Sequence, residues 1–252
     1  MIVISVLNHK GGVGKTTTVI NLSAALAVAG YSVLIVDMDG QANSTQATIG
    51  KGELAVSNFN AFVDDDVPLP IIEAWENLNV APSAKKMAQL DLYLASAMNR
   101  EYILRNKLAE LKQPFDFVLI DCPPSQGLAS VNALTASDYV LIPLEGEVFA
   151  YEGLYRVNET ISMVQKNSNP KLKLLGVFLT KLNKQRGLSK VVKEGAGKIY
   201  GDAFLETEIR IDVRLAEAPT MRQSIFQFAP LSNGATDYSK LTTEILKKLN
   251  NG

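Results

Sequence analysis

The chain has 252 residues, of which 47% are hydrophobic and 20% charged, and its formal net charge at pH 7 is −1. The single cysteine, Cys122, excludes an intramolecular disulfide and any CxxC metal or cluster motif. There is no signal-peptide pattern and no uncharged apolar run of about 18 residues, so we expect one cytoplasmic domain, residues 1–252, without a membrane partner.

The first motif joins an apolar run, Met1–Leu7, to a helical pattern over Thr16–Ala29 that Gly30 ends. A glycine-rich loop between a strand and a helix N-terminus directs backbone N–H groups and the helix dipole at one point, which suits polyphosphate. Lys15 can reach the β- and γ-phosphates and the Thr16 hydroxyl suits Mg²⁺. The predicted nucleotide-binding residues here are Lys10, Gly11, Gly12, Val13, Gly14, Lys15, Thr16 and Thr17.

This loop departs from the strict pattern G-x-x-x-x-G-K-[ST] at its first position, which is His9. A second lysine, Lys10, enters the loop instead. Lys15 already serves the phosphates of its own chain, so a second ammonium is redundant unless it meets charge from elsewhere. His9 is interpreted as a loop residue beside the nucleotide, without a catalytic role.

Beyond the loop, short β-branched runs alternate with helical patterns, which is typical of a doubly wound, mostly parallel α/β sheet with helices on both faces. Pro143 is expected to end the fifth strand, and Gly50–Pro70 to form a surface excursion. The last predicted helix is Asp237–Leu249. The expected strands are Ile2–Leu7, Val33–Asp37, Leu78–Ala81, Phe117–Asp121, Tyr139–Pro143, Leu174–Thr180 and Ala203–Leu205.

Aspartates stand at the ends of two of these strands. Asp37 ends one strand and Asp39 follows it, and Asp121 ends another. The carboxyl ends of parallel strands meet at one edge of a sheet, so these side chains should converge on the glycine-rich loop. ATP carries about four negative charges, and carboxylates beside it are tolerable when they face the metal or a water. Mg²⁺ keeps several waters. We therefore expect Thr16 to bind it directly and Asp39 and Asp121 to act mainly through its waters.

Charge is concentrated in residues 165–200, where nine basic residues stand against one acid, Glu194, so that the segment is +8 and the remainder −9. A one-sided cluster of this size favours a polyanion, and its few aromatic residues argue against stacking on single-stranded bases. Contacts to the backbone of double-stranded DNA are expected. The basic residues are Lys166, Lys171, Lys173, Lys181, Lys184, Arg186, Lys190, Lys193 and Lys198.

The loop with its additional lysine resembles the deviant Walker A box of the ParA/MinD ATPases. Val33–Asp39 resembles the second strand and switch I of that family, and Phe117–Pro124 its Walker B strand and switch II. Val213–Pro219 is similar to its late R-L-x-E-A-P motif. The resemblance covers nearly the whole chain and is strongest to the chromosomal Soj/ParA type.

The resemblance implies a P-loop ATPase that uses ATP and Mg²⁺ and forms an ATP-dependent homodimer with two nucleotides between the subunits. Lys10 would cross to the nucleotide of the other subunit, Asp39 would position the attacking water, and Asp37 would support it. Lys10, Lys15 and Asp39 are thus the catalytic candidates. Adenine would lie against Ile209, Arg210, Ile211 and Asn183, and DNA against Lys184, Arg186, Lys190 and Arg214.

In that family a ParB-like partner bound to DNA accelerates hydrolysis, and the cycle moves a chromosome or plasmid. The expected location is therefore the cytoplasm, associated with the nucleoid. No helix-turn-helix domain precedes the loop, so sequence-specific operator binding is not expected. A ParA-like role in positioning a non-DNA cargo remains an alternative.

Two segments depart from the family pattern. Relatives usually read P-Q-G-N after the second aspartate, whereas this chain has Gly40-Gln41-Ala42-Asn43, which is expected to loosen the turn. Arg210 stands where relatives usually have a proline between the residues that flank adenine. The adenine contacts are therefore less firmly predicted than the phosphate contacts.

Three alternatives share the loop. A MinD-like membrane-cycling ATPase for division-site placement needs a C-terminal amphipathic helix with a basic polar face, whereas only Lys247 and Lys248 lie near the end of the last predicted helix. A ligase similar to dethiobiotin synthetase is disfavoured by Lys10 and the R-L-x-E-A-P segment. A nitrogenase-type reductase needs two cluster cysteines per subunit, which the cysteine count excludes.

Overall fold

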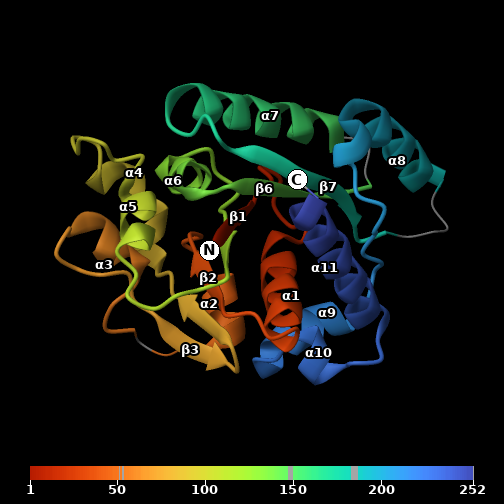
Figure 1. Ribbon diagram of the computed structural model, residues 1–252, viewed down its shortest axis with the longest axis horizontal. Coiled ribbons are helices and arrows are strands. Elements are labelled where there is room, and N and C mark those ends of the chain that lie inside the picture. The colour runs from red at the N-terminus through yellow and green to blue at the C-terminus, as the bar shows by residue number, and fades with distance from the viewer. Residues whose placement is uncertain (51, 53, 147–149, 183–186, 252) are drawn as a thin grey trace.

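The computed structural model describes residues 1–50, 52, 54–146, 150–182 and 187–251. Its described part contains a sheet in the order β3-β4-β2-β5-β1-β6-β7, in which only the β3–β4 pair is antiparallel (Figure 1). This arrangement confirms the predicted fold class. The strands are β1 Ile2–Val6, β2 Val33–Asp37, β3 Ile72–Trp75, β4 Leu78–Ala81, β5 Phe117–Asp121, β6 Tyr139–Glu145 and β7 Lys173–Thr180.

Helices cover both faces of the sheet, with α1 and α11 on one face and α6 and α7 on the other (Figure 1). The α-helices are α1 Lys15–Val28, α2 Asn43–Thr48, α3 Asn58–Val63, α4 Leu90–Tyr93, α5 Ile103–Ala109, α6 Leu128–Ala136, α7 Ala150–Asn167, α8 Gly187–Tyr200, α9 Arg214–Glu217, α10 Ile225–Phe228 and α11 Asn233–Asn251. Short 3₁₀ helices are η1 Lys85–Gln89, η2 Gly201–Ala203 and η3 Ala218–Met221.

The core consists of two apolar layers, one on each face of the sheet. In β2, Leu34 and Val36 pack into one layer and Val33 and Ile35 into the other, and all four are fully buried. Because successive side chains of a strand point to opposite faces, a strand covered on both sides is a continuous apolar run. This burial explains why the central strands are the elements that the sequence predicts most clearly.

Two strand predictions were wrong, one of a whole strand and one of a strand end. Ala203–Leu205 is not a strand, because η2 occupies Gly201–Ala203 and Phe204 makes only an isolated bridge to Val177. Pro143 does not end β6, which continues to Glu145 paired with β7. Since β1 pairs with β6 only as far as Leu141, the missing N–H of Pro143 removes no ladder bond to β1.

The sequence reading missed β3, which follows the predicted excursion and pairs with β4 at the edge of the sheet. Its residues are only partly buried, and the turn into β4 is Glu76-Asn77, with Asn77 at φ 60°. This turn lacks the Asn-Gly or Asp-Gly pair that marks most two-residue hairpins. An exposed edge strand with that turn gives little sequence signal.

In the loop after β2, a glycine occupies a tightly packed position and an alanine has a left-handed backbone, which is the reverse of what these residues usually do. Gly40 packs tightly, because a Cβ built on it would lie 2.7 Å from both the backbone nitrogen and the Cβ of Ala88. Ala42, in contrast, has a left-handed backbone at φ 54°, which is strained for a residue with a Cβ. The absence of a side chain at Gly40 therefore permits a close approach to η1.

Within the described ranges, no helix combines the length and the apolar character that crossing a bilayer requires.

Candidate nucleotide-binding site

The glycine-rich loop connects the end of β1 to the start of α1 at the centre of the sheet. Gly12 and Gly14 have φ values of +78° and +91°, a region that residues with a Cβ rarely adopt. A Cβ on Gly11 or Gly12 would meet nothing within 4 Å, so no other residue packs against the loop at these two positions. Gly14 caps α1 without a side-chain bond. The first turn of this helix therefore presents backbone donors to an anion.

Lys15 lies beneath this loop with only 7% of its surface exposed. Its ammonium donates to the backbone oxygen of Lys10 at 3.2 Å. Burial lowers the pKa of Lys15, whereas the charges of Asp121 and Asp39 raise it. The ammonium is thus held against the loop and close to two carboxylates, where it could bind a phosphate oxygen.

Asp37 and Asp121 are direct neighbours in the parallel register of β2 and β5, and both are fully buried. Asp37 accepts from the backbone N–H of Thr45 at 2.9 Å, from the Thr45 hydroxyl at 2.6 Å and from the backbone N–H of Asp39 at 3.1 Å. Burial first, and then the charge of Asp121, raises the pKa of Asp37. Asp37 therefore fixes the loop after β2 and the first turn of α2.

Asp121 has the features of a carboxylate that acts on a metal through water. Its Oδ2 accepts from the Ser44 hydroxyl at 2.5 Å, while its buried Oδ1 has no hydrogen-bond partner among the described residues. Burial raises its pKa, and the hydroxyls of Ser44 and Thr16 oppose that rise. A buried acceptor without a donor is costly, and water molecules around a hydrated Mg²⁺ would satisfy it. Thr16 and Asp121 thus fit a magnesium ion.

Asp39 lies at the rim of this site and is half-buried. Its Oδ1 accepts from the backbone N–H of Gln41 at 2.9 Å, which orients the carboxylate. The charge of Asp39 acts on Lys15 and on Asp121, so the three side chains share one electrostatic site. The structure therefore brings Lys15, Thr16, Asp39 and Asp121 together, as the strand-end argument requires.

Lys10 is at the mouth of the loop. Its ammonium lies 3.7 Å from Glu145 Oε2 at the end of β6, and 37% of its side chain is exposed. Glu145 also pairs with Lys181, at 3.9 Å. The Lys10 ammonium thus points along the rim toward β6, whereas Lys15 lies inside the loop.

His9, at the start of the loop, contacts α7. Its Nε2 lies 2.9 Å from the Thr160 hydroxyl oxygen. Burial first, and then the charges of Lys15 and Arg156, lower the pKa of His9. The contact with Thr160 joins the loop to α7.

A cleft of about 390 Å³, here called the base end because the predicted adenine contacts line it, opens beside Gly14 and Thr17. Ile209, Arg210 and Ile211, which the family resemblance placed beside adenine, line one wall of this cleft. The cleft also reaches residues that the sequence reading had not assigned to it. These are Glu145, Gly146, Thr180, Lys181, Asp212, Val213, Leu215, Ala216 and Tyr238.

The predicted DNA-binding residues are only partly described. Lys184 and Arg186 lie outside the described residues, as does the side chain of Lys190. The same holds for Asn183, which was predicted as an adenine contact. Arg214 begins α9, with half of its side chain exposed and its Nη1 3.9 Å from Asp212 Oδ1.

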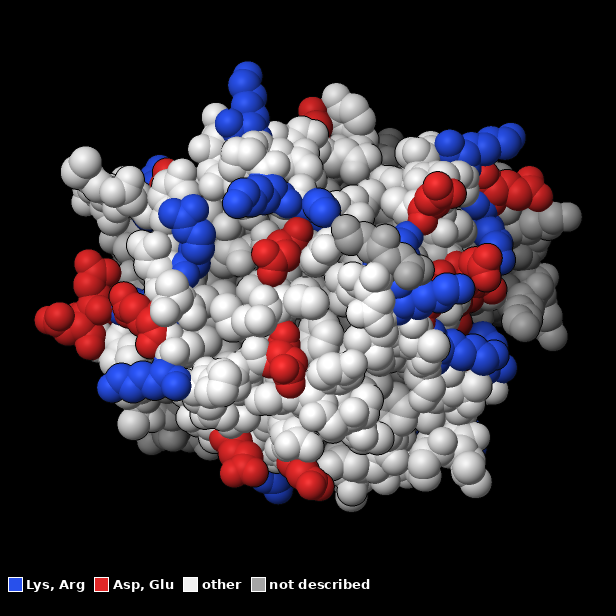
Figure 2. All heavy atoms as spheres, viewed as in Figure 1, with Lys and Arg blue, Asp and Glu red and all other residues white. Residues whose placement is uncertain are grey.

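Two members of the basic segment are paired with acids. Lys193 pairs with Glu208 at 2.7 Å, and Lys181 with Glu145. Over α8 and its neighbours, at the right of the view, blue and red side chains alternate (Figure 2). Part of the positive charge of the segment is therefore balanced locally.

The C-terminal helix packs its apolar face against the sheet. Tyr238, Leu241 and Ile245 are fully or almost fully buried, and Leu246 and Leu249 pack against the same layer. The apolar face of α11 is therefore part of the core.

Comparisons with known proteins agree with this geometry. A protein-family model described as an AAA domain matches residues 1–174. The chain is 42% identical over 246 residues to the sporulation initiation inhibitor protein Soj of Bacillus subtilis, covering 96% of this chain and 97% of Soj. It is 35% identical to the chromosome partitioning protein ParA of Caulobacter vibrioides, covering 98% and 94%.

Among solved structures, the cobyrinic acid a,c-diamide synthase of Mycobacterium smegmatis superimposes with a TM-score of 0.87 at 32% identity. The match covers 100% of this chain and 96% of that one. That protein was crystallised with ADP and magnesium, and also with an ATP analogue and magnesium.

Proposed function

The chain belongs to the Soj/ParA group of the ParA/MinD ATPase family, and on that premise we propose that it is a DNA partition ATPase. It is an ATP hydrolase that works with magnesium. In the proposed cycle, residues 1–252 act as one domain, and ATP stabilises a sandwich dimer of two such chains. The dimer binds double-stranded DNA without sequence specificity. Hydrolysis of ATP, stimulated by a ParB-like partner, then releases the protein from the DNA. The cargo would be a chromosome or a plasmid, and the protein would associate with the nucleoid.

The observation that carries this proposal is the presence of two lysines at one phosphate loop. Lys15 is buried under the loop, and Lys10 is at its mouth, partly exposed and directed along the rim. A lysine at the mouth can exchange a contact of 3.7 Å with Glu145 for the triphosphate of a second subunit. Lys15 alone would be enough for binding within one chain.

Within each subunit, the roles follow from position. The loop amides and Lys15 would hold the phosphates, and the Thr16 hydroxyl with Asp121 would hold the magnesium ion. Asp39, half-buried at the rim and oriented by the Gln41 N–H, would position the attacking water. Magnesium would neutralise charge that develops on the phosphate oxygens.

The DNA contacts would come from Arg214 and the basic segment, with Lys184, Arg186 and Lys190 as the candidates. One protomer offers few such contacts, and a dimer doubles them. If each protomer neutralised about three phosphates, the salt slope of the dimer would be near −5. Monomers would then dissociate readily at physiological salt. ATP can drive this switch only through its higher affinity for the dimer.

The MinD-like alternative requires a C-terminal helix that is available to a membrane. Here Tyr238, Leu241 and Ile245 of α11 are buried against the sheet, so releasing this helix would expose core side chains. Burial of α11 therefore favours DNA over a lipid surface.

A binding assay with two competing surfaces tests the proposal. The Asp39→Ala protein, with ATP and Mg²⁺, is offered a fluorescent 60-base-pair duplex or vesicles of anionic lipid. We expect ATP-dependent retention on the duplex and none on the vesicles. Arg214→Glu should weaken DNA binding about tenfold or more without preventing dimerisation, and Lys112→Glu, a surface change on another face, should not. Retention on vesicles alone, or DNA binding that is equally strong with and without ATP, would overturn the proposal.

A further inference from the structure

The base end of the cleft contains an ion pair whose acidic partner is buried. Arg210 donates to Asp237 from Nη2 at 2.6 Å and from Nε at 2.9 Å, and its backbone N–H donates to the same carboxylate at 3.0 Å. Only 5% of the Asp237 side chain is exposed, against 31% for Arg210. A bidentate pair with one buried partner is stronger and better defined in direction than an ordinary surface pair.

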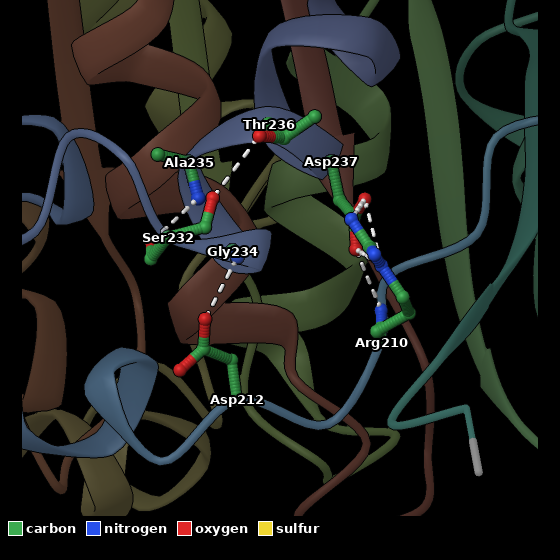
Figure 3. A network of polar contacts seen from close by, with 7 residues as sticks. All are labelled: Arg210, Asp212, Ser232, Gly234, Ala235, Thr236 and Asp237. Carbon is green, nitrogen blue, oxygen red and sulfur yellow. Dashed lines mark hydrogen bonds and ion pairs between the residues drawn. The ribbon is translucent and has the colours of Figure 1, made fainter.

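This pair fastens a wall of the cleft that belongs to no regular strand. On one side, Ile209 and Ile211 exchange backbone hydrogen bonds with Leu182, the residue after Lys181 at the end of β7. On the other side, Arg210 reaches Asp237 in α11, and Asp212 Oδ2 accepts from the Gly234 N–H at the start of that helix (Figure 3). The wall is therefore held by hydrogen bonds to the end of β7 on one side and to α11 on the other.

One partner of the pair lines the cleft, and the other is next in sequence to a residue that lines it. Arg210 lines it directly, and Asp237 precedes Tyr238, which lines it from α11. Loss of the pair would allow this wall to move relative to α11, while the phosphate loop, which is fixed by β1 and α1, would stay in place.

We propose that the Arg210–Asp237 pair is a positioning device for the nucleotide base, which holds the Ile209–Asp212 wall at the spacing that the base requires. This inference rests on the proposed binding of ATP in the cleft. Arg210 and Asp237 act through the wall, far from the reacting phosphate, so they are positioning residues and not catalytic ones. They should stabilise the bound ground state and the transition state equally. Loss of the pair should therefore raise KM and leave kcat unchanged.

Two ligands separate the base from the phosphates. The full chain and its Arg210→Ala, Asp237→Ala and doubly substituted variants are titrated with MgATP and with magnesium tripolyphosphate, which has no base. Coupling energies between residues in contact correspond to roughly a twofold to 150-fold change in an equilibrium constant, and for a pair with a partly exposed arginine we expect a change of about fivefold to tenfold. We expect ATP binding to weaken by that factor and tripolyphosphate binding to change less than twofold.

The remaining variants test the pair itself. The double variant should bind ATP no more weakly than the weaker single variant, and Arg210→Lys should recover part of the affinity. Lys193→Ala and Glu208→Ala are matched controls, because they break an ion pair of 2.7 Å. Glu208 lies two residues before Arg210, and neither member of the pair lines the cleft. Both should bind ATP like the unmodified chain. Steady-state kinetics should show the KM increase without a change in kcat.

Several outcomes would overturn this inference. ATP affinity that is unchanged in all variants would do so, as would equal weakening of ATP and tripolyphosphate, which indicates general damage to the fold. If Asp237→Ala does not fold, Arg210→Ala and Arg210→Lys decide the question, since the Arg210 side chain is partly exposed. An unmodified chain that binds neither ligand would contradict the proposed function itself.

Discussion

The phosphate end and the base end of the cleft are built in different ways. At the phosphate end, backbone geometry does most of the positioning, because glycines with positive φ join a central strand to a helix N-terminus. At the base end, an irregular segment is held by side-chain contacts such as Arg210 with Asp237. Backbone geometry is defined locally by the sequence, whereas such contacts join residues far apart in it. We therefore expect changes at the phosphate end to have the larger effects.

Lys15→Ala should have the largest effect. It removes a buried ammonium that would make charge-assisted hydrogen bonds to phosphate, so ATP affinity should fall at least about 100-fold in isothermal titration. Lys181→Ala, at the base end of the same cleft, is the matched control and should weaken binding less than about threefold. Equal losses for the two variants would contradict the difference between the two ends.

Asp39→Ala should come second and should separate binding from chemistry. Loss of the group that positions the water should lower kcat about 100-fold, with little change in KM. Phosphate release under saturating ATP measures this effect, and Asp66→Ala on an exposed loop is the control. A variant with normal kcat would show that the attacking water is positioned by another residue.

Gly40→Ala should test the packing beneath the phosphate end. The new methyl group would lie 2.7 Å from the nitrogen and Cβ of Ala88, so unfolding free energy should fall by about 1–3 kcal/mol. Ala42→Gly should act in the opposite direction, because it removes strain from a left-handed alanine. Urea denaturation measures both changes. Unchanged stability in Gly40→Ala would mean that the loop is free to move away from η1.

Gly12→Ala should have the smallest effect of the four and should isolate the role of the backbone. Its methyl group meets no atom within 4 Å, yet φ is +78°, so strain alone should lower stability by about 1–2 kcal/mol. In a chain of this size that is a decrease in Tm of roughly 2–8 °C. Gly11→Ala has the same open surroundings without a positive φ and should melt normally. Identical melting of the two variants would contradict backbone control of the loop.

The sequence was sufficient to predict the phosphate end because its signals are local. The strand, the glycines, Lys15 and Thr16 are contiguous, and the strands that carry Asp37 and Asp121 have the predicted bounds. Continuous burial on both faces makes such strands distinct in the sequence. The positions of these residues in one site followed from parallel topology alone.

The sequence could not predict contacts between distant residues. Nothing near Arg210 indicates a carboxylate 27 positions later, and nothing near Gly40 indicates the approach of Ala88. The edge of the sheet was equally difficult, since β3 is partly exposed and Ala203–Leu205 has strand-like composition without a strand ladder. In each case tertiary packing decides the conformation.

In the proposed dimer, Lys10 of each subunit binds the nucleotide of its partner. Multi-angle light scattering of the Asp39→Ala protein tests it, with no nucleotide, with ADP and with ATP. We predict monomers in the first two states and a dimer with ATP, and only monomers with ATP when Lys10→Ala is added. A dimer of the doubly substituted protein, or an Asp39→Ala protein that stays monomeric in ATP, would contradict the claim.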